Sequence, residues 1–214
     1  MNFFKPKFWD KNKVSFFAIL LLPISLIIKF SFFCKSIFSK KKKFTIPVIC
    51  VGNIYLGGTG KTPLTIEIFS ILKQLNMNPA FIRKRYSSFQ DEANLQMQVG
   101  KVYQNKKRAD AINNAIKNKA NVAILDDGFQ DFSINKNLSI ICFNENQGIG
   151  NGLTIPSGPL RESLSGLKRA DYTIINGKKN IKLENEILKK NNRVKIFYMS
   201  YKPVNIEEFK NNKV

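Results

Sequence analysis

A glycine-rich segment, GNIYLGGTGKTP at residues 52–63, constrains the fold of this chain more than any other stretch. A short apolar, β-branched run at 46–52 leads into it and is typical of a buried strand. The residues after it, 64–75, have apolar positions at helical spacing. A strand, a glycine-rich loop and Gly-Lys-Thr at the start of a helix together predict a phosphate-binding P-loop. A flexible turn with a chance Gly-Lys-Thr is the alternative.

Each part of this loop has a predicted task in holding a nucleotide. Glycines let backbone N–H groups face phosphate oxygens, and the helix N-terminus adds a favourable dipole. We expect Lys61 to reach the β- and γ-phosphates and the Thr62 hydroxyl to bind Mg²⁺. Tyr55 departs from the strict pattern, which has glycine at that position. The predicted nucleotide-binding residues form one run: Leu56, Gly57, Gly58, Thr59, Gly60, Lys61, Thr62 and Pro63.

A second source of carboxylates lies in VAILDDGFQD, where an apolar strand ends on Asp126 and Asp127. If that strand neighbours the P-loop strand, its carboxyl end lies close to Thr62. Asp126 is therefore the predicted second metal ligand beside Thr62, and Asp127 joins Lys61 among the predicted catalytic residues. The alternative is an ordinary polar turn after a strand.

Strands and helices alternate along the rest of the chain. Further strands are expected at 79–83, 121–127, 138–143, 172–176 and 194–200, and further helices at 108–119 and 183–190. This rhythm predicts an α/β fold of the P-loop NTPase type, with a mostly parallel sheet and helices on both faces.

The N-terminal region differs in character from everything after it. Val14–Ile28 is uncharged and interrupted by Pro23, and a basic cluster follows at Lys40–Lys43. A spanning helix needs about 20 apolar residues, so this shorter run favours a helix lying in an acidic membrane surface. A spanning helix and a helix buried within the protein are the alternatives. We expect a membrane-associating region at 1–43 and a P-loop domain at 44–214.

Composition narrows the possible chemistry. The chain has 35 Lys and Arg residues against 15 Asp and Glu residues, a formal net charge of +20, which favours anionic partners. It contains no histidine, and this excludes His-based catalytic triads. Cys34, Cys50 and Cys142 lie far apart inside apolar runs and are interpreted as reduced core thiols.

Three motifs in one order resemble the tetraacyldisaccharide 4'-kinases, or lipid A 4'-kinases. They are VGNIYLGGTGKTP at 51–63, LDDGFQ at 125–130 and PSGPLRESLSGLKRAD at 156–171. The resemblance implies transfer of the γ-phosphoryl group of ATP, with Mg²⁺, to the 4'-hydroxyl of a tetraacyldisaccharide 1-phosphate. It implies a lipid substrate and a place at the cytoplasmic face of the bacterial inner membrane, reached through the N-terminal helix, with no nucleic-acid partner.

The resemblance also assigns two more catalytic residues. Asp91, in FQDEANL, matches the family's catalytic base, and Arg161 is a candidate phosphate clamp. The alternatives are an acidic first turn of a helix for Asp91 and a surface ion pair with Glu162 for Arg161.

Some positions depart from the family pattern. Asp131 stands where the family has histidine, and KRYSS at 84–88 replaces a glycine-containing motif. Family members are longer, so we expect their C-terminal region to be truncated or absent here. Two other functions stay open: a catalytically inactive or impaired relative of the kinase, and a P-loop ATPase stimulated by nucleic acid.

Overall fold

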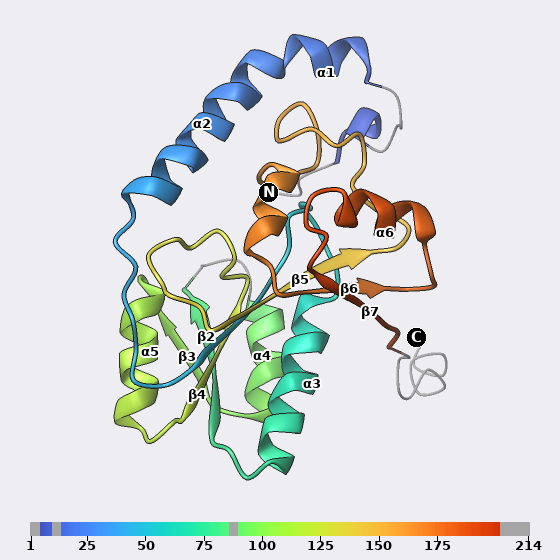
Figure 1. Cartoon of the computed structure of the whole chain (residues 1–214). Coiled ribbons are helices and arrows are strands. Elements are labelled where there is room, and N and C mark those ends of the chain that lie inside the picture. The colour runs from blue at the N-terminus through green and yellow to red at the C-terminus, as the bar shows by residue number, and fades with distance from the viewer. Residues whose placement is uncertain (1–4, 10–13, 86–89, 202–214) are drawn as a thin grey trace, which may run out of the picture.

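Seven strands form a single sheet in the computed structural model, which describes residues 5–9, 14–85 and 90–201. The order is β3-β2-β4-β1-β5-β6-β7, and every neighbouring pair is parallel (Figure 1). The strands are β1 (Val48–Gly52), β2 (Pro79–Lys84), β3 (Val102–Asn105), β4 (Val122–Asp126), β5 (Leu138–Asn144), β6 (Tyr172–Asn176) and β7 (Lys195–Met199).

Helices cover both faces of this sheet. The α-helices are α1 (Phe16–Leu20), α2 (Leu22–Phe38), α3 (Lys61–Gln74), α4 (Gln90–Val99), α5 (Arg108–Lys117) and α6 (Ile181–Leu188), with short 3-10 turns η1 (Lys7–Trp9) and η2 (Leu164–Arg169). Alternate side chains of each buried strand point to opposite faces. On one face they pack against α5 and α6, and on the other against α3. The predicted α/β architecture is therefore confirmed.

The register of the central strands places the predicted site at one edge of the sheet. β1 lies between β4 and β5, with Val51 paired to Asp126 and Gly52 paired to Ile141. Because all strands run the same way, the loops after β1, β2 and β4 emerge at the same carboxyl edge. Ligands of open parallel sheets bind outside this edge.

The N-terminal apolar run forms two helices rather than one. Ser15 caps α1 by accepting a hydrogen bond from the backbone N–H of Ala18, and Pro23 lies at the start of α2. Proline is tolerated in the first turn of a helix but not in its interior, so a new helix begins there. α2 then continues past Lys29, where the predicted run ends, as far as Phe38.

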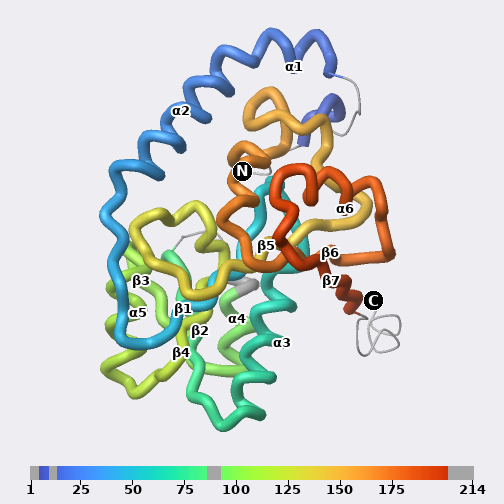
Figure 2. The backbone as a smooth tube through the Cα atoms, in the orientation of Figure 1, coloured from blue at the N-terminus to red at the C-terminus, as the bar shows by residue number. Residues whose placement is uncertain are grey.

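We call α1 and α2 together the N-terminal arm (residues 16–38). The arm arches over one end of the molecule and descends along its side before the chain enters β1 (Figures 1 and 2). Ser25 of α2 is almost fully buried, and its hydroxyl donates to the backbone oxygen of Thr154 at 3.0 Å and contacts the Ser157 hydroxyl at 2.8 Å. Within the described residues, no helix combines the length and the apolar character that crossing a membrane requires.

Candidate active site

The loop between β1 and α3 has the backbone geometry of a phosphate cradle. Gly57 and Gly60 have φ angles of 135° and 86°, conformations that residues with a side chain rarely adopt. Gly60 directly precedes the first turn of α3, so free N–H groups of that turn face the loop. The Asn53 amide donates to the backbone oxygens of Tyr55 at 2.6 Å and Gly57 at 3.1 Å. These bonds hold the loop in shape without any ligand.

Tyr55, the departure from the usual loop pattern, has a structural explanation. Its side chain is fully buried, and its backbone forms an antiparallel bridge with Leu160. The backbone N–H of Leu56 donates to the oxygen of Pro159 at 2.8 Å, and that of Arg161 donates to Ile54 at 2.7 Å. The loop is thereby tied to the segment that ends on Arg161.

Asp126, at the end of β4, lies beside the first turn of α3. Its Oδ2 atom is 3.5 Å from the Thr62 hydroxyl, so the two residues predicted to bind Mg²⁺ lie close together. The same oxygen accepts hydrogen bonds from Arg83 at 2.8 Å and from the Gln96 amide at 3.0 Å. Gln96 also donates to Thr65 at 2.8 Å, so this buried cluster connects β2, α4, β4 and α3.

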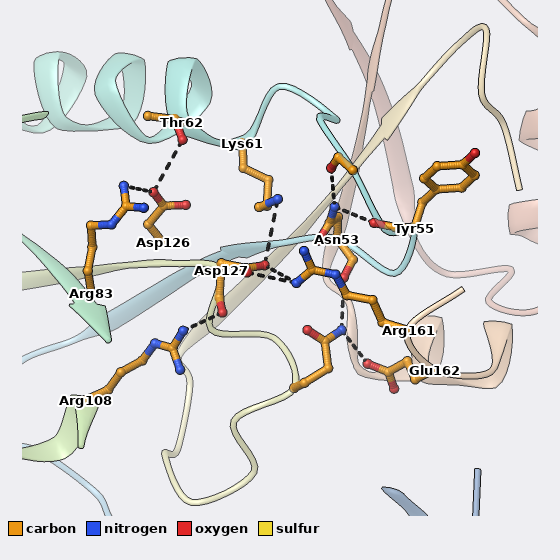
Figure 3. A network of polar contacts seen from close by, with 12 residues as sticks. Asn53, Tyr55, Lys61, Thr62, Arg83, Arg108, Asp126, Asp127, Arg161 and Glu162 are labelled. Carbon is orange, nitrogen blue, oxygen red and sulfur yellow. Dashed lines mark hydrogen bonds and ion pairs between the residues drawn. The ribbon is translucent and has the colours of Figure 1, made fainter. Parts of the chain in front are cut away.

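Asp127 is the centre of a second cluster, shown in Figure 3. One guanidinium nitrogen of Arg161 lies 2.7 and 2.8 Å from its two carboxylate oxygens, and the Lys61 ammonium lies 3.8 Å away. Arg108 donates to the backbone oxygen of Asp127 at 2.7 Å and fixes a residue whose φ angle is 57°. Two cations therefore converge on one carboxylate at the open edge of the sheet.

These cations decide the charge state of Asp127. Burial on its own raises the pKa of a carboxyl group, but the charges of Lys61 and Arg161 outweigh it and hold the pKa of Asp127 below its ordinary value. Asp127 is consequently ionised at neutral pH.

The alternative in which Arg161 pairs with Glu162 is wrong, because Arg161 pairs with Asp127. Glu162 instead accepts from Arg169 at 2.6 Å and from Gln130 at 2.8 Å, and its side chain is buried. Arg169 also lies over the rings of Phe129 and Phe132, with 4.6 and 4.9 Å to the centroids. These contacts of Glu162 and Arg169 brace the segment that presents Arg161.

Asp91 is placed only by its backbone. It belongs to the first turn of α4, and its side chain lies outside the part of the chain that the structure describes. α4 follows β2, so it begins at the carboxyl edge of the sheet, and Gln96 on the same helix contacts Asp126. A rise of about 1.5 Å per residue puts Asp91 roughly 7.5 Å along the helix axis from Gln96. The role of Asp91 as base stays a prediction.

Three residues of the site were not anticipated from the sequence: Arg83, Gln96 and Arg108. Arg83 and Arg108 are less than a tenth exposed and Gln96 is fully buried, which is rare for such side chains unless they are paired. Arg83 closes a predicted strand and Arg108 opens a predicted helix, so both lie where polar residues are ordinary. No local signal distinguished them from surface residues.

The fold and this edge of the sheet define a nucleotide-binding protein of the P-loop type, with paired carboxylates and converging cations. The model of the family described as tetraacyldisaccharide-1-P 4'-kinase matches residues 17–101 and 91–214. The chain belongs to this family, as its three motifs predicted.

Curated relatives agree with the family match. A tetraacyldisaccharide 4'-kinase of Pelagibacter ubique is 46% identical over 214 residues, covering 98% of this chain and 67% of the relative. Another, from Paramagnetospirillum magneticum, is 34% identical over 191 residues, covering 81% of this chain and 58% of the relative. The chain thus spans from about three fifths to about two thirds of the length of these relatives.

Solved structures support the fold. LpxK from Aquifex aeolicus, whose crystal structure is in complex with ATP, superposes with a TM-score of 0.63 at 20% identity, covering 86% of this chain and 82% of that one. The signal recognition particle 54 kDa protein from Aeropyrum pernix, in complex with GDP, gives a TM-score of 0.52 at 9% identity, covering 89% of this chain and 50% of that one.

Proposed function

We propose that this chain binds ATP with Mg²⁺ and transfers the γ-phosphoryl group to the 4'-hydroxyl of a tetraacyldisaccharide 1-phosphate. The observation that carries the proposal is the convergence of Lys61 and Arg161 on Asp127 beside a glycine-rich loop, in a chain of this family. The name of the family supplies the substrate, an acylated disaccharide phosphate.

The residues present fit a nucleotide triphosphate and a divalent cation. Nothing lies within 4 Å of the point where a side chain on Gly58 would begin, so the loop is open on that side. The buried Thr59 hydroxyl has no hydrogen-bond partner among the described residues, as expected for a donor kept for a phosphate oxygen. Thr62 offers a hydroxyl oxygen and Asp126 a carboxylate oxygen, and Mg²⁺ prefers oxygen ligands. The bound Mg²⁺ would neutralise charge on the phosphates.

The side-chain cations Lys61 and Arg161 provide the remaining positive charge that stabilises the transferred phosphoryl group. Lys61 and Arg161 are held at Asp127 before any substrate arrives, so little reorganisation is needed when phosphate oxygens approach. An ionised Asp127 keeps both cations at the same edge. Asp91, if its side chain reaches this edge from α4, accepts the proton of the sugar hydroxyl late in the transfer.

We assign membrane attachment to residues 1–43 and phosphoryl transfer to residues 44–214. Many large apolar side chains on the arm and just before it are at least 47% exposed: Val14, Phe16, Phe17, Ile19, Leu20, Ile24, Leu26, Ile27, Phe30, Phe33, Ile37 and Phe38. Lys40–Lys43 follow one residue after the end of the arm. An apolar face beside a basic cluster is typical of a helix lying in an anionic leaflet. We propose the cytoplasmic face of the inner membrane, where ATP and a lipid substrate meet.

The proposal is tested by incubating the purified chain with labelled ATP, Mg²⁺ and the disaccharide 1-phosphate lipid. We expect a bis-phosphorylated product, and Lys61→Ala should lower its rate by about 10²- to 10³-fold, the usual loss for one preorganised electrostatic contact. Asp91→Asn should slow turnover while ATP binding stays close to that of the wild type.

Other outcomes would replace the proposal with one of the two open alternatives. ATP binding without any lipid product identifies an inactive relative. ATP hydrolysis that rises with added RNA or DNA, and falls again with salt, identifies a nucleic-acid-stimulated ATPase. Unchanged turnover in Lys61→Ala removes the P-loop from the mechanism.

A further inference from the structure

We propose that Gln96 is a positioning residue that fixes helix α4, and with it the predicted base Asp91, against the predicted metal ligand Asp126. The inference rests on the proposed function, because Asp91 and Asp126 take these roles only if the chain transfers phosphoryl groups. No motif in the sequence singled out Gln96.

Helix α4 lies beside α3 and is held there by very little apolar burial (Figure 1). Among the α4 side chains that the structure describes, only those of Ala93 and Gln96 are buried. The apolar side chains of Leu95, Met97 and Val99 are 51%, 53% and 42% exposed. The methyl group of an alanine removes little apolar surface from water. The position of α4 therefore depends on the polar contacts of Gln96 more than on apolar packing of its own side chains.

The Gln96 amide contacts three neighbouring elements at once. Its nitrogen donates to Asp126 Oδ2 on β4 at 3.0 Å and to the Thr65 hydroxyl on α3 at 2.8 Å. Its oxygen accepts from the Arg83 guanidinium on β2 at 3.2 Å. A carboxylate only accepts and a guanidinium only donates, so one orientation of the amide satisfies both. Hydrogen bonds to charged groups are also the stronger kind, which makes Gln96 the main attachment of α4.

The other end of α4 is fixed by close packing. Gly100 directly follows the helix, and a side chain at this position would collide with the Phe69 ring of α3. At about 1.5 Å per residue, Asp91 lies roughly 12 Å along the axis from Val99, the last residue of α4, but only about 7.5 Å from Gln96. Without the Gln96 contact, the end of the helix that carries Asp91 would be the least constrained.

The same contact relates the base to the metal ligand. Asp126 Oδ2, which accepts from Gln96, lies 3.5 Å from the hydroxyl of Thr62, the other predicted Mg²⁺ ligand. In phosphoryl transfer the base must align the attacking hydroxyl with the γ-phosphate, and a displacement of about 1 Å can cost roughly 10²-fold in rate. Gln96 thus sets the position of Asp91 relative to the place where the phosphates are held.

Hydrogen exchange of the full chain, followed by mass spectrometry, tests the attachment of α4. Gln96→Met keeps the length of the side chain and removes its hydrogen bonds, so the α4 amides should exchange at least about tenfold faster. Gln98→Met is the matched control, because Gln98 lies on the same helix but is exposed, and exchange should stay within about twofold. Thr65→Val removes one of the three bonds and should give a smaller increase, which decides the question if Gln96→Met does not fold.

Turnover separates positioning from a purely structural role. Gln96→Met should lower kcat by about tenfold or more, while calorimetry should give an affinity for ATP with Mg²⁺ within about threefold of the wild type. Asp126 keeps its ion pair with Arg83 in this variant. In combination with Asp91→Asn, Gln96→Met should cause less than about twofold further loss, because a positioning residue has no effect once the group that it positions is gone.

The outcomes distinguish this inference from the proposed function. If α4 exchanges at the wild-type rate in both Gln96→Met and Thr65→Val, the inference is overturned and the proposed function stands. The inference is also overturned if the losses from Gln96→Met and Asp91→Asn multiply. If the wild type forms no lipid product, the proposed function fails, whereas the exchange rates still decide whether Gln96 fixes α4.

Discussion

The sheet and the N-terminal arm use the same kinds of apolar side chain in opposite ways. Phe81 on β2 and Phe143 on β5 are 0% exposed, whereas Phe16 on α1 and Phe38 on α2 are 74% and 79% exposed. The arm is joined to the rest of the protein by a few specific contacts, among them the buried Ser25 and the Phe32 ring against Phe132. Burial in the sheet stabilises the fold, whereas exposure on the arm leaves an apolar surface of the kind that the proposed membrane attachment needs.

Stability measurements give the largest expected contrast between the two regions. Phe143→Ala should lower the free energy of unfolding by about 3–5 kcal/mol, because it removes a fully buried ring and leaves a cavity. Phe30→Ala on the arm, where the side chain is 67% exposed, should change it by less than about 0.5 kcal/mol. Urea titration of both variants measures this. Equal losses would mean that the arm is part of the core.

Thiol reactivity separates the regions in the native state. Cys34 on α2 is half-buried, whereas Cys50 and Cys142 are buried in the sheet, and burial raises their pKa values to about 11 and about 12. A disulfide reagent at pH 8 should modify Cys34 first and the two sheet thiols at least ~100-fold more slowly, since the thiolate is the reactive form. Mass spectrometry at successive times measures the modification of each thiol.

The sequence-based prediction that all three cysteines are core thiols is wrong for Cys34, because its side chain is only half-buried.

Membrane partition tests the arm directly. Combined Ile27→Ser and Phe30→Ser should lower binding to anionic vesicles by at least about 30-fold, since each apolar side chain contributes about 1.5–3 kcal/mol when fully transferred and both are about two thirds exposed. Leu75→Ser is the matched control, because Leu75 is also exposed, at 65%, but lies at the end of α3. Cosedimentation with vesicles measures both. Equal losses would place the contact surface outside the arm.

The dependence of the free energy of unfolding on acid pH should give the smallest difference between the two regions. We expect it to arise at the carboxyl edge of the sheet and not on the arm. The pKa of Asp127 lies below its ordinary value of 3.8, so its ion pairs stabilise the folded state above that pH and are lost as the pH falls through the lowered pKa. Asp127→Asn should flatten part of the decline in the free energy of unfolding below about pH 4. The arm has no Asp or Glu and contributes nothing to this slope. An unaltered acid profile in the variant would contradict the pairing.

The sequence correctly predicted the strands and helices that a local pattern of apolar residues marks. β1, α3 and β4 each coincide with an apolar run of suitable period, and the motif spacing placed Lys61, Thr62 and Asp126 together. Those residues needed only the knowledge that parallel strands share a carboxyl edge.

The rest depended on contacts between distant parts of the chain. β3 is a short edge strand of sequence VYQN with only half-buried residues, so no apolar run marks it. α4 is mainly polar, and its buried Gln96 is explained by partners far away in the sequence, Thr65 and Asp126, which lie 31 and 30 residues from it. Arg161 meets Asp127 across 34 residues. Such pairings leave no periodic trace in a sequence.

One loop belongs to both regions at once. Ser157 contacts the hydroxyl of Ser25 on the arm. Four residues later, Arg161 forms an ion pair with Asp127, and its backbone N–H donates a hydrogen bond to the oxygen of Ile54. If α2 moved into a lipid surface, its contact with Ser157 would transmit that movement to the short segment that carries the Arg161 guanidinium. If the proposed membrane attachment holds, the tilt of the protein on the membrane and the position of the Arg161 guanidinium would therefore be coupled.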